Sequence, residues 1–162
     1  MSDYMFMLDS HLSSDQSKVL SLVREAAAQS NLNIFLTGGA MRDMLGGFPI
    51  RDLDFTVEGN ALKFAKMLAD KHGAKIVEID ENRKCAALLF PNGVTVEMGM
   101  ARQERYSKTG SNPHVPPATL HDDLRGRDFT VTAIGLSLST ASFGLLLDPT
   151  NGRSEEQKSQ IK

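Results

Sequence analysis

A glycine pair followed by charged residues makes the stretch from Gly38 to Asp54 the most chemically suggestive part of the chain. Gly38 and Gly39 come directly after the apolar run 34–36, so the backbone can turn tightly there and leave its N–H groups free to hold a phosphate. Arg42 follows on a predicted short helix, whose N-terminus adds partial positive charge to the forked donors of the guanidinium. The stretch therefore predicts an anion-binding loop.

Two carboxylates follow this loop, at Asp52 and Asp54, directly before the predicted strand 55–57. Side chains two apart on a strand point to the same side, so we expect both carboxylates on one face and Leu53 in the core. Mg²⁺ prefers carboxylate oxygens and completes its coordination shell with phosphate and water. The pair therefore predicts a Mg²⁺ site beside the phosphate loop. The alternative without a functional site is an ordinary glycine turn followed by two solvated acids at the end of a strand.

Two amphipathic helices and a short buried strand are predicted to position this region. Residues 14–29 and 61–72 carry apolar side chains at helical spacing; a serine can cap the first helix, and Gly73 can end the second. Residues 34–37 are predicted to form a short buried strand that leads into the glycine pair. Residues 1–13 are predicted to be a loose lead-in whose apolar side chains dock on the domain.

Three further strands are predicted over 74–79, 84–90 and 94–98. The turn 91–93, Pro-Asn-Gly, joins the last two as a hairpin, so these strands must be antiparallel and the sheet mixed, in an α+β fold. Glu97 alternates with valines on its strand and so lies on the face opposite to them. From the residues alone it is an exposed strand glutamate.

Length, charge and cysteine content narrow the class of protein. The 162 residues suit one domain with a sizeable hydrophobic core. With 18 Lys and Arg against 20 Asp and Glu, the net charge is -2. A nucleic acid would therefore have to be held by a local basic patch or by protein parts outside this chain. The single cysteine excludes an internal disulfide framework. No apolar stretch approaches membrane-spanning length, which predicts a cytoplasmic protein without a membrane partner.

The order G-G-x-x-R-D, a short loop, then D-x-D resembles the head domain of the class II nucleotidyltransferases, which are the CCA-adding enzymes and bacterial poly(A) polymerases. A second segment, 122–134, is similar to the D-L-x-R-R-D-F-T-I-N-A segment of that family, and the resemblance covers about 34–152. It implies the nucleotidyltransferase (polymerase β-like) fold, a mixed and mostly antiparallel sheet with helices packed on it. Residues 14–152 would form the head domain, and the polar tail 153–162 lies where the helical neck would begin.

The resemblance also implies roles for single residues. Glu97, on the strand ahead of an Ala-Arg pair, would join the two aspartates as a catalytic acid. Arg127 would reach the phosphate or base of a nucleotide and Asp128 its ribose hydroxyl, beyond a proline-bearing loop over 103–117. Gly126 and Thr132 stand where the family usually has Arg and Asn, which removes a cation near the site and changes a structural hydrogen bond.

The activity that follows from this resemblance is metal-dependent transfer of AMP or CMP from ATP or CTP to an RNA 3′ end, with tRNA the favoured acceptor. Positioning and charge neutralisation would do the catalysis, without a protein nucleophile. Two alternatives stay open: a non-catalytic nucleotide-binding module, and a nucleotidyltransferase acting on a non-RNA acceptor.

Overall fold

The computed structural model of the chain describes residues 3–101 and 134–147. Their strands form one sheet in the order β3-β4-β5-β2-β1-β6-β7. The strands are β1 Asn33–Leu36, β2 Leu53–Glu58, β3 Lys75–Asp80, β4 Cys85–Leu89, β5 Thr95–Met100, β6 Gly135–Ser137 and β7 Leu146–Leu147. β2 and β5 pair in parallel, and every other neighbouring pair in this sheet is antiparallel. The prediction of a mixed, mostly antiparallel sheet is confirmed.

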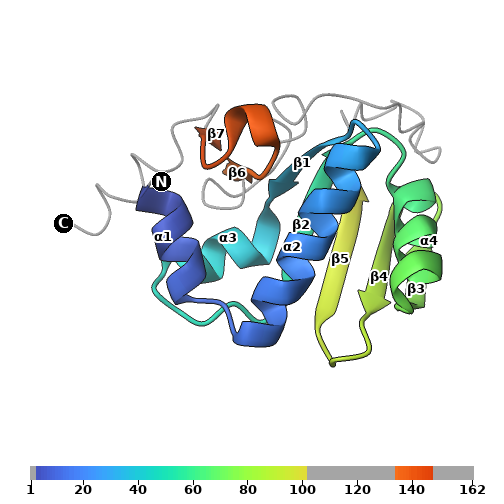
Figure 1. Cartoon of the computed structure of the whole chain (residues 1–162), viewed down its shortest axis with the longest axis horizontal. Coiled ribbons are helices and arrows are strands. Elements are labelled where there is room, and N and C mark those ends of the chain that lie inside the picture. The colour runs from blue at the N-terminus through green and yellow to red at the C-terminus, as the bar shows by residue number, and fades with distance from the viewer. Residues whose placement is uncertain (1–2, 102–133, 148–162) are drawn as a thin grey trace, which may run out of the picture.

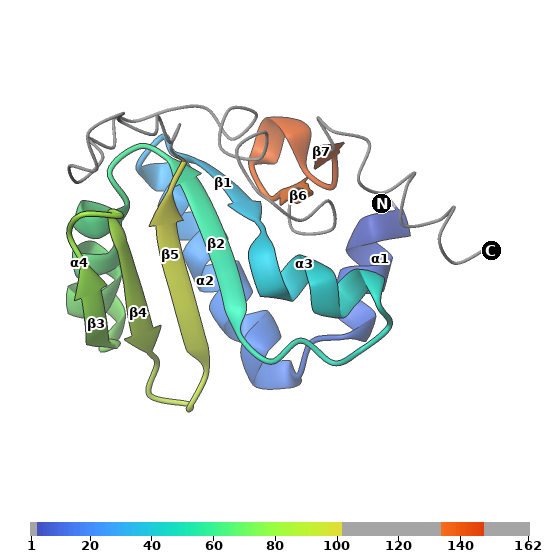
Figure 2. The same ribbon diagram turned by 180° about the vertical axis from the view of Figure 1, so that it is seen from behind.

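Helices cover one face of the sheet. They are α1 Asp3–Ser10, α2 Ser14–Gln29, α3 Gly38–Leu45 and α4 Ala61–His72, with a 3₁₀ helix at Thr140–Ser142. α2 and α4 lie in front of the strands in Figure 1, and α3 continues from the end of β1. Figure 2 shows the opposite face, where β2, β5, β4 and β3 stand in front of these two helices. Within the described residues this face carries no helix, and we call it the open face.

The helices begin and end where local chemistry favours it. Ser13 caps α2, because its hydroxyl accepts the Gln16 N–H at 3.1 Å while the Gln16 side chain accepts the Ser13 N–H at 2.9 Å. Asn60 caps α4 through the Lys63 N–H, and Gly73 ends it in the left-handed conformation. The predicted bounds of both helices, 14–29 and 61–72, agree with the structure.

The core lies between the sheet and its helices. Side chains alternate along β5, so Val96 and Met98 are fully buried under the helices while Thr95 and Glu97 are exposed on the open face. β2 buries Leu53 and its alternate neighbours on the helix side in the same way. Acidic side chains are therefore directed to the open face by the same alternation that fills the core.

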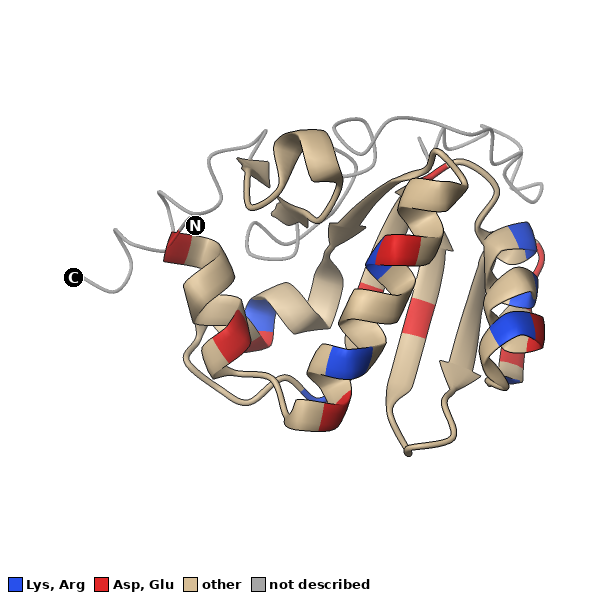
Figure 3. Cartoon of the chain, viewed as in Figure 1, with Lys and Arg blue, Asp and Glu red and all other residues tan. Residues whose placement is uncertain are grey.

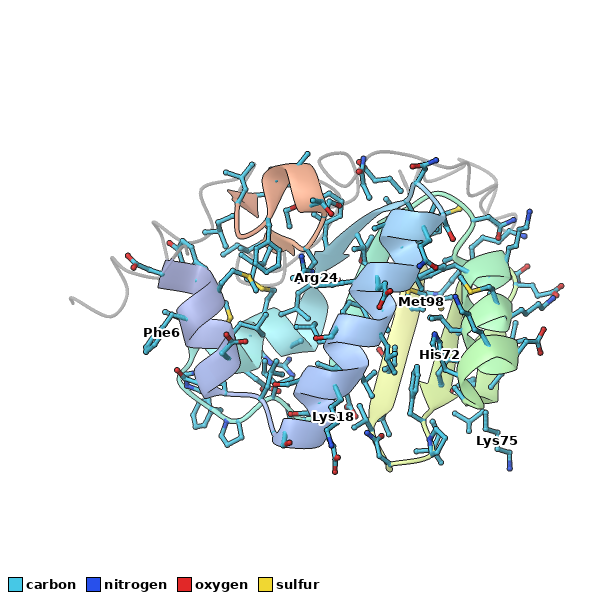
Figure 4. All side chains as sticks on the ribbon, in the orientation of Figure 1. Phe6, Lys18, Arg24, His72, Lys75 and Met98 are labelled. Atoms are coloured by element: carbon cyan, nitrogen blue, oxygen red, sulfur yellow. The ribbon has the colours of Figure 1, made fainter. Side chains whose placement is uncertain are left out.

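The structure differs from the expectation at the N-terminus. Residues 3–10 of the expected loose lead-in form α1, and Met5 and Leu8 belong to the main core. Phe6, the aromatic side chain between them, does not dock on the domain: it is exposed and points away from the molecule (Figure 4). The difference follows from packing, because an eight-residue helix has little stability of its own and forms where its apolar face is buried.

A short segment near the C-terminal end completes the sheet beyond β1. β6 pairs with β1 through Phe35 opposite Ser137. Arg24 of α2 holds this segment, because its Nε donates to the Leu138 carbonyl at 3.0 Å and its guanidinium lies 3.7 Å from the centre of the Phe143 ring. Figure 4 shows Arg24 between α2 and this segment. Within the mostly apolar run 143–147, only Leu146–Leu147 forms a strand.

Several expectations lie outside the described residues. They are the proline-bearing loop over 103–117, the roles of Arg127 and Asp128, and the polar tail 153–162. In the ranges that the structure does describe, none of the helices combines the length and the apolar character needed to cross a membrane.

Candidate functional site

The glycine pair sits at the point where β1 passes into α3, and that junction is tied to β2. Thr37 ends the extended segment, is buried, and shares a hydrogen bond of 2.8 Å between its hydroxyl and that of Thr56. The Thr37 N–H also donates to the Asp54 carbonyl at 3.0 Å. The next residue, Gly38, has a φ of +59°, in the left-handed region that favours glycine. The loop is therefore fixed against the strand that carries the acids.

The Asp54 carboxylate fills the space beside the two glycines. Its Oδ2 accepts the Ala40 N–H at 3.0 Å, which satisfies one of the free N–H groups of the first turn of α3. A Cβ added to Gly38 would stand 3.2 Å from this oxygen, and one added to Gly39 would stand 3.1 Å from it. The glycines thus let the acid approach the start of the helix. Among residues 3–101 and 134–147, nothing accepts the N–H of Gly38 or Gly39.

Asp54 lies next to a second acid on the open face. It stands opposite Glu97 in the parallel register of β2 and β5, and the two side chains are hydrogen-bonded. Burial is the main cause that raises the pKa of Asp54 to about 7; the Glu97 and Asp52 charges push it the same way, while the Ala40 N–H lowers it. The structure thus brings Glu97 to the aspartates.

Asp52 precedes β2 and is exposed. The Thr95 hydroxyl donates to its Oδ1. Thr95 and Glu97 are two apart on β5 and so point to the same side, which places Asp52 and Asp54 on the open face together. In the described ranges no three or more His, Cys, Asp or Glu side chains form a group that could hold a metal ion. The carboxylates that remain as candidate ligands are the predicted pair, with Glu97 beside Asp54.

Arg42 stands at the glycine pair, as the sequence predicted. It is exposed on α3, and its Nη2 lies 3.4 Å from the position that a Cβ on Gly39 would occupy. No acid within the described part of the chain forms an ion pair with it. A fully charged guanidinium is therefore available to an anion at the start of α3.

A cavity of about 490 Å³ occupies the open face. At one end it is lined by Gly38, Gly39, Asp54 and Glu97, and at the other by residues of β3 and the turn after it. The distant wall includes Glu78, Asp80 and Arg83, of which Asp80 and Arg83 form an ion pair at 3.8 Å. The cavity thus begins at the glycine pair and runs across β5 and β4 to the edge of the sheet.

Three residues that contact the site have no role in the prediction from the sequence. Ala40 and Thr95 hydrogen-bond to the aspartates only because the fold brings them there. For Thr95 the sequence does hold a signal, since its spacing from Glu97 places both on one face of their strand. Asp43, next to Arg42, is buried and accepts the Arg51 N–H at 3.3 Å and the Arg51 Nη2 at 3.4 Å. It holds the loop that leads to the acids and does not line the cavity.

Basic side chains gather on the other side of the sheet. Figure 3 shows blue positions along α4, where Lys63, Lys66 and Lys71 are exposed. α4 packs on the face of the sheet opposite to the acids. This group of lysines therefore does not border the cavity, and it offers no basic wall for a nucleic acid entering there.

Comparison with known proteins places this geometry in a family. A profile described as the poly(A) polymerase head domain matches residues 34–162. An A-adding tRNA nucleotidyltransferase of Halalkalibacterium halodurans is 38% identical over 153 residues, and a CC-adding tRNA nucleotidyltransferase of Deinococcus radiodurans is 35% identical over 150. The solved structure of a CCA-adding enzyme in its apo form II superposes with a TM-score of 0.85 at 28% identity.

The matches cover nearly all of this chain and a minor part of the relatives. They span 94% and 91% of the chain in the two tRNA nucleotidyltransferases, and 97% in the solved structure. The chain corresponds to 36%, 39% and 37% of those proteins in the same order. The likeness therefore concerns one region of longer enzymes.

Proposed function

The chain belongs to the family of poly(A) polymerase head domains, and on that premise we propose that it transfers AMP or CMP from ATP or CTP to the 3′ end of an RNA, with tRNA as the acceptor. The observation that carries the proposal is the contact between the Asp54 carboxylate and the start of α3, within reach of Gly38 and Gly39. Acids and free helix N–H groups at one point suit a phosphate chain accompanied by a cation. A tRNA acceptor would place the reaction in the cytoplasm.

The donor set fits a divalent cation, which enzymes of this family typically use. Burial, and then the charges of Glu97 and Asp52, disfavour the ionised form of Asp54, and a bound cation would favour it. We assign Asp52 and Asp54 as ligands of Mg²⁺, with Glu97 as the third catalytic acid. When bound, Mg²⁺ neutralises phosphate charge and lowers the pKa of an attacking hydroxyl.

The chain's own groups would bind and orient the triphosphate. The N–H groups of Gly38 and Gly39 and the partial charge of the α3 N-terminus face an anion at the cavity end, and Arg42 adds a forked pair of donors. These contacts hold the nucleotide in one orientation and lower the cost of bringing the reactants together. The binding of phosphate or base by Arg127, and of the ribose by Asp128, stays a prediction from the sequence.

The relatives do not fix which nucleotide is added, because one is named A-adding and the other CC-adding. The test is incorporation of labelled ATP and of labelled CTP into tRNA transcripts that lack the terminal CCA or end in CC. We expect Mg²⁺-dependent transfer by the chain, abolished by a chelator. Asp54→Asn keeps an oxygen for the Ala40 N–H but removes the charge, and should lower transfer by a factor on the order of 10² to 10³.

Asp70→Asn is the matched control, because Asp70 is an exposed acid on α4 away from the open face. It should transfer at the wild-type rate. Nucleotide binding without turnover in the wild type would favour a nucleotide-binding module, and unchanged turnover in Asp54→Asn would refute the metal assignment.

A further inference from the structure

Asp52 differs from Asp54 in how the fold supports it. Asp54 lies inside β2, paired with β5, while Asp52 comes one residue before the strand begins at Leu53. Asp54 is also held by the Ala40 N–H, whereas the Asp52 side chain is exposed. A carboxylate outside the strand ladder has rotational freedom that it must lose before it can serve as a ligand. Its support must therefore come from other contacts.

The backbone that leads to Asp52 is held from the helix side. The Ile50 N–H donates to the His11 carbonyl at 3.0 Å, and the Gln16 amide donates to the Ile50 carbonyl at 2.7 Å. The Arg51 N–H donates to the buried Asp43 carboxylate at 3.3 Å. Three contacts within two residues fix the path of the chain as it reaches the site, and they leave the Asp52 side chain free to turn.

The side chain of Asp52 is held from β5 by the Thr95 hydroxyl, which donates to Oδ1. The backbone at Thr95 is held by strands on both sides of β5. Thr95 pairs with Leu89 of β4, and its neighbour Val96 pairs with Leu53 of β2. The hydroxyl therefore sits on a rigid part of the sheet. Its hydrogen bond engages one carboxylate oxygen and leaves Oδ2 of Asp52 for another partner.

We propose that Thr95 is a positioning residue that holds the Asp52 carboxylate in the orientation needed to bind the divalent cation. The inference rests on the proposed function, since it takes Asp52 as a metal ligand. Groups that hydrogen-bond to metal ligands fix the direction of the ligand atoms, and their loss typically weakens metal affinity by about 10- to 100-fold. Thr95 has no assigned part in binding the nucleotide, so its effect should be seen with the metal alone.

The test is a Mn²⁺ titration of the 162-residue chain without nucleotide, followed by the electron paramagnetic resonance signal of free Mn²⁺. Thr95→Val keeps the size and the strand preference of threonine but lacks the hydroxyl, and should raise the Mn²⁺ dissociation constant on the order of tenfold. Thr95→Ser keeps the hydroxyl and should bind close to the wild type. Thr140→Val, at an exposed threonine in the 3₁₀ helix, is the matched control and should change nothing.

A double variant isolates the contact. In an Asp52→Asn background, Thr95→Val should cause no further loss of Mn²⁺ affinity, because the hydroxyl would act only through Asp52. The inference is overturned if Thr95→Val binds Mn²⁺ as the wild type does, if Thr95→Ser is as weak as Thr95→Val, or if the wild type binds no Mn²⁺. Thermal unfolding of each variant establishes that a weaker binder is folded.

The titration also separates this inference from the proposed function. Mn²⁺ binding needs no turnover. A wild-type chain that binds Mn²⁺ but transfers no nucleotide would refute the proposed activity, and the Mn²⁺ affinities of the Thr95 variants would still test the role of Thr95. If transfer occurs, its rate in Thr95→Val should recover as Mg²⁺ is raised, while the KM for the nucleotide at saturating Mg²⁺ stays near the wild-type value.

Discussion

At the scale of single residues, the site depends on how closely a carboxylate can approach a helix terminus. Asp54 reaches the Ala40 N–H because neither Gly38 nor Gly39 carries a Cβ, and both positions would place one within 3.2 Å of its Oδ2. The glycines thus serve two purposes: Gly38 adopts a left-handed turn, and the pair leaves room for the acid. These purposes can be separated by substitution.

Gly38→Ala and Gly47→Ala form a matched pair. Both glycines have positive φ, +59° and +80°, so each substitution should lower the free energy of unfolding by about 1 to 2 kcal/mol, measured by urea denaturation. A Cβ at Gly47 meets nothing within 4 Å, whereas one at Gly38 presses on Asp54. We therefore expect nucleotidyl transfer to fall at least about tenfold in Gly38→Ala and to stay unchanged in Gly47→Ala. Equal losses of transfer in both would show that backbone strain, not the crowding of Asp54, matters.

The site residues that could be predicted from the sequence are those whose positions follow from spacing along the chain. Asp52 and Asp54 are two apart before a strand, and the glycine pair follows an apolar run, so their shared face and the turn could be predicted. Ala40 could not, because it acts through a backbone N–H. Alternation on β5 places Thr95 on the same face as Glu97, but its contact with Asp52 depends on the parallel register of β2 and β5. Register depends on the whole sheet.

At the scale of elements, α2, α4 and the short helix α3 that carries Arg42 were predicted from local signals, whereas α1 and β6 were not. α2 and α4 carry caps and apolar stripes along their length, which define them without tertiary information. α1 has eight residues, and β6 has three; such segments form because they are buried against other elements. The buried face of α1 joins the core beside α2, so its removal should matter to the fold.

Leu8→Ala tests whether α1 is part of the folded unit. Leu8 is fully buried in the main core, so its truncation should lower the free energy of unfolding by about 2 to 5 kcal/mol in urea denaturation. Phe6→Ala on the same helix removes a larger side chain that is 69% exposed, and should change stability by less than about 0.5 kcal/mol. If both variants were as stable as the wild type, α1 would be only loosely attached, as the sequence had suggested.

At the scale of the whole molecule, charge is unevenly distributed although its sum is small. The net charge is -2, yet the acids meet on the open face and the lysines of α4 lie on the covered side. Concentrated negative charge at a cavity repels a polyanion unless cations intervene. Folding is linked to pH and to divalent ions at the same place, because burial first, and then the neighbouring Glu97 and Asp52 charges, raise the pKa of Asp54 from 3.8 to about 7.

The sign of this linkage determines how the stability of the fold changes with pH. Between about pH 4 and pH 7 the folded chain binds a proton at Asp54 that the unfolded chain has released, so this contribution to stability is complete below about pH 3.8 and is lost as the pH rises through 7. In urea denaturation the free energy of unfolding should fall over that pH window, on the order of a few kcal/mol, and Asp54→Asn should not show this fall.

Mg²⁺ should stabilise the fold through the same carboxylate. Above pH 7, MgCl₂ at ten times its dissociation constant should raise the free energy of unfolding of the wild type by about 1.4 kcal/mol, compared with KCl at matched ionic strength. Near pH 5 the gain should be smaller, because a proton competes with the cation at Asp54. Equal stabilisation of Asp54→Asn by Mg²⁺ would place the cation elsewhere.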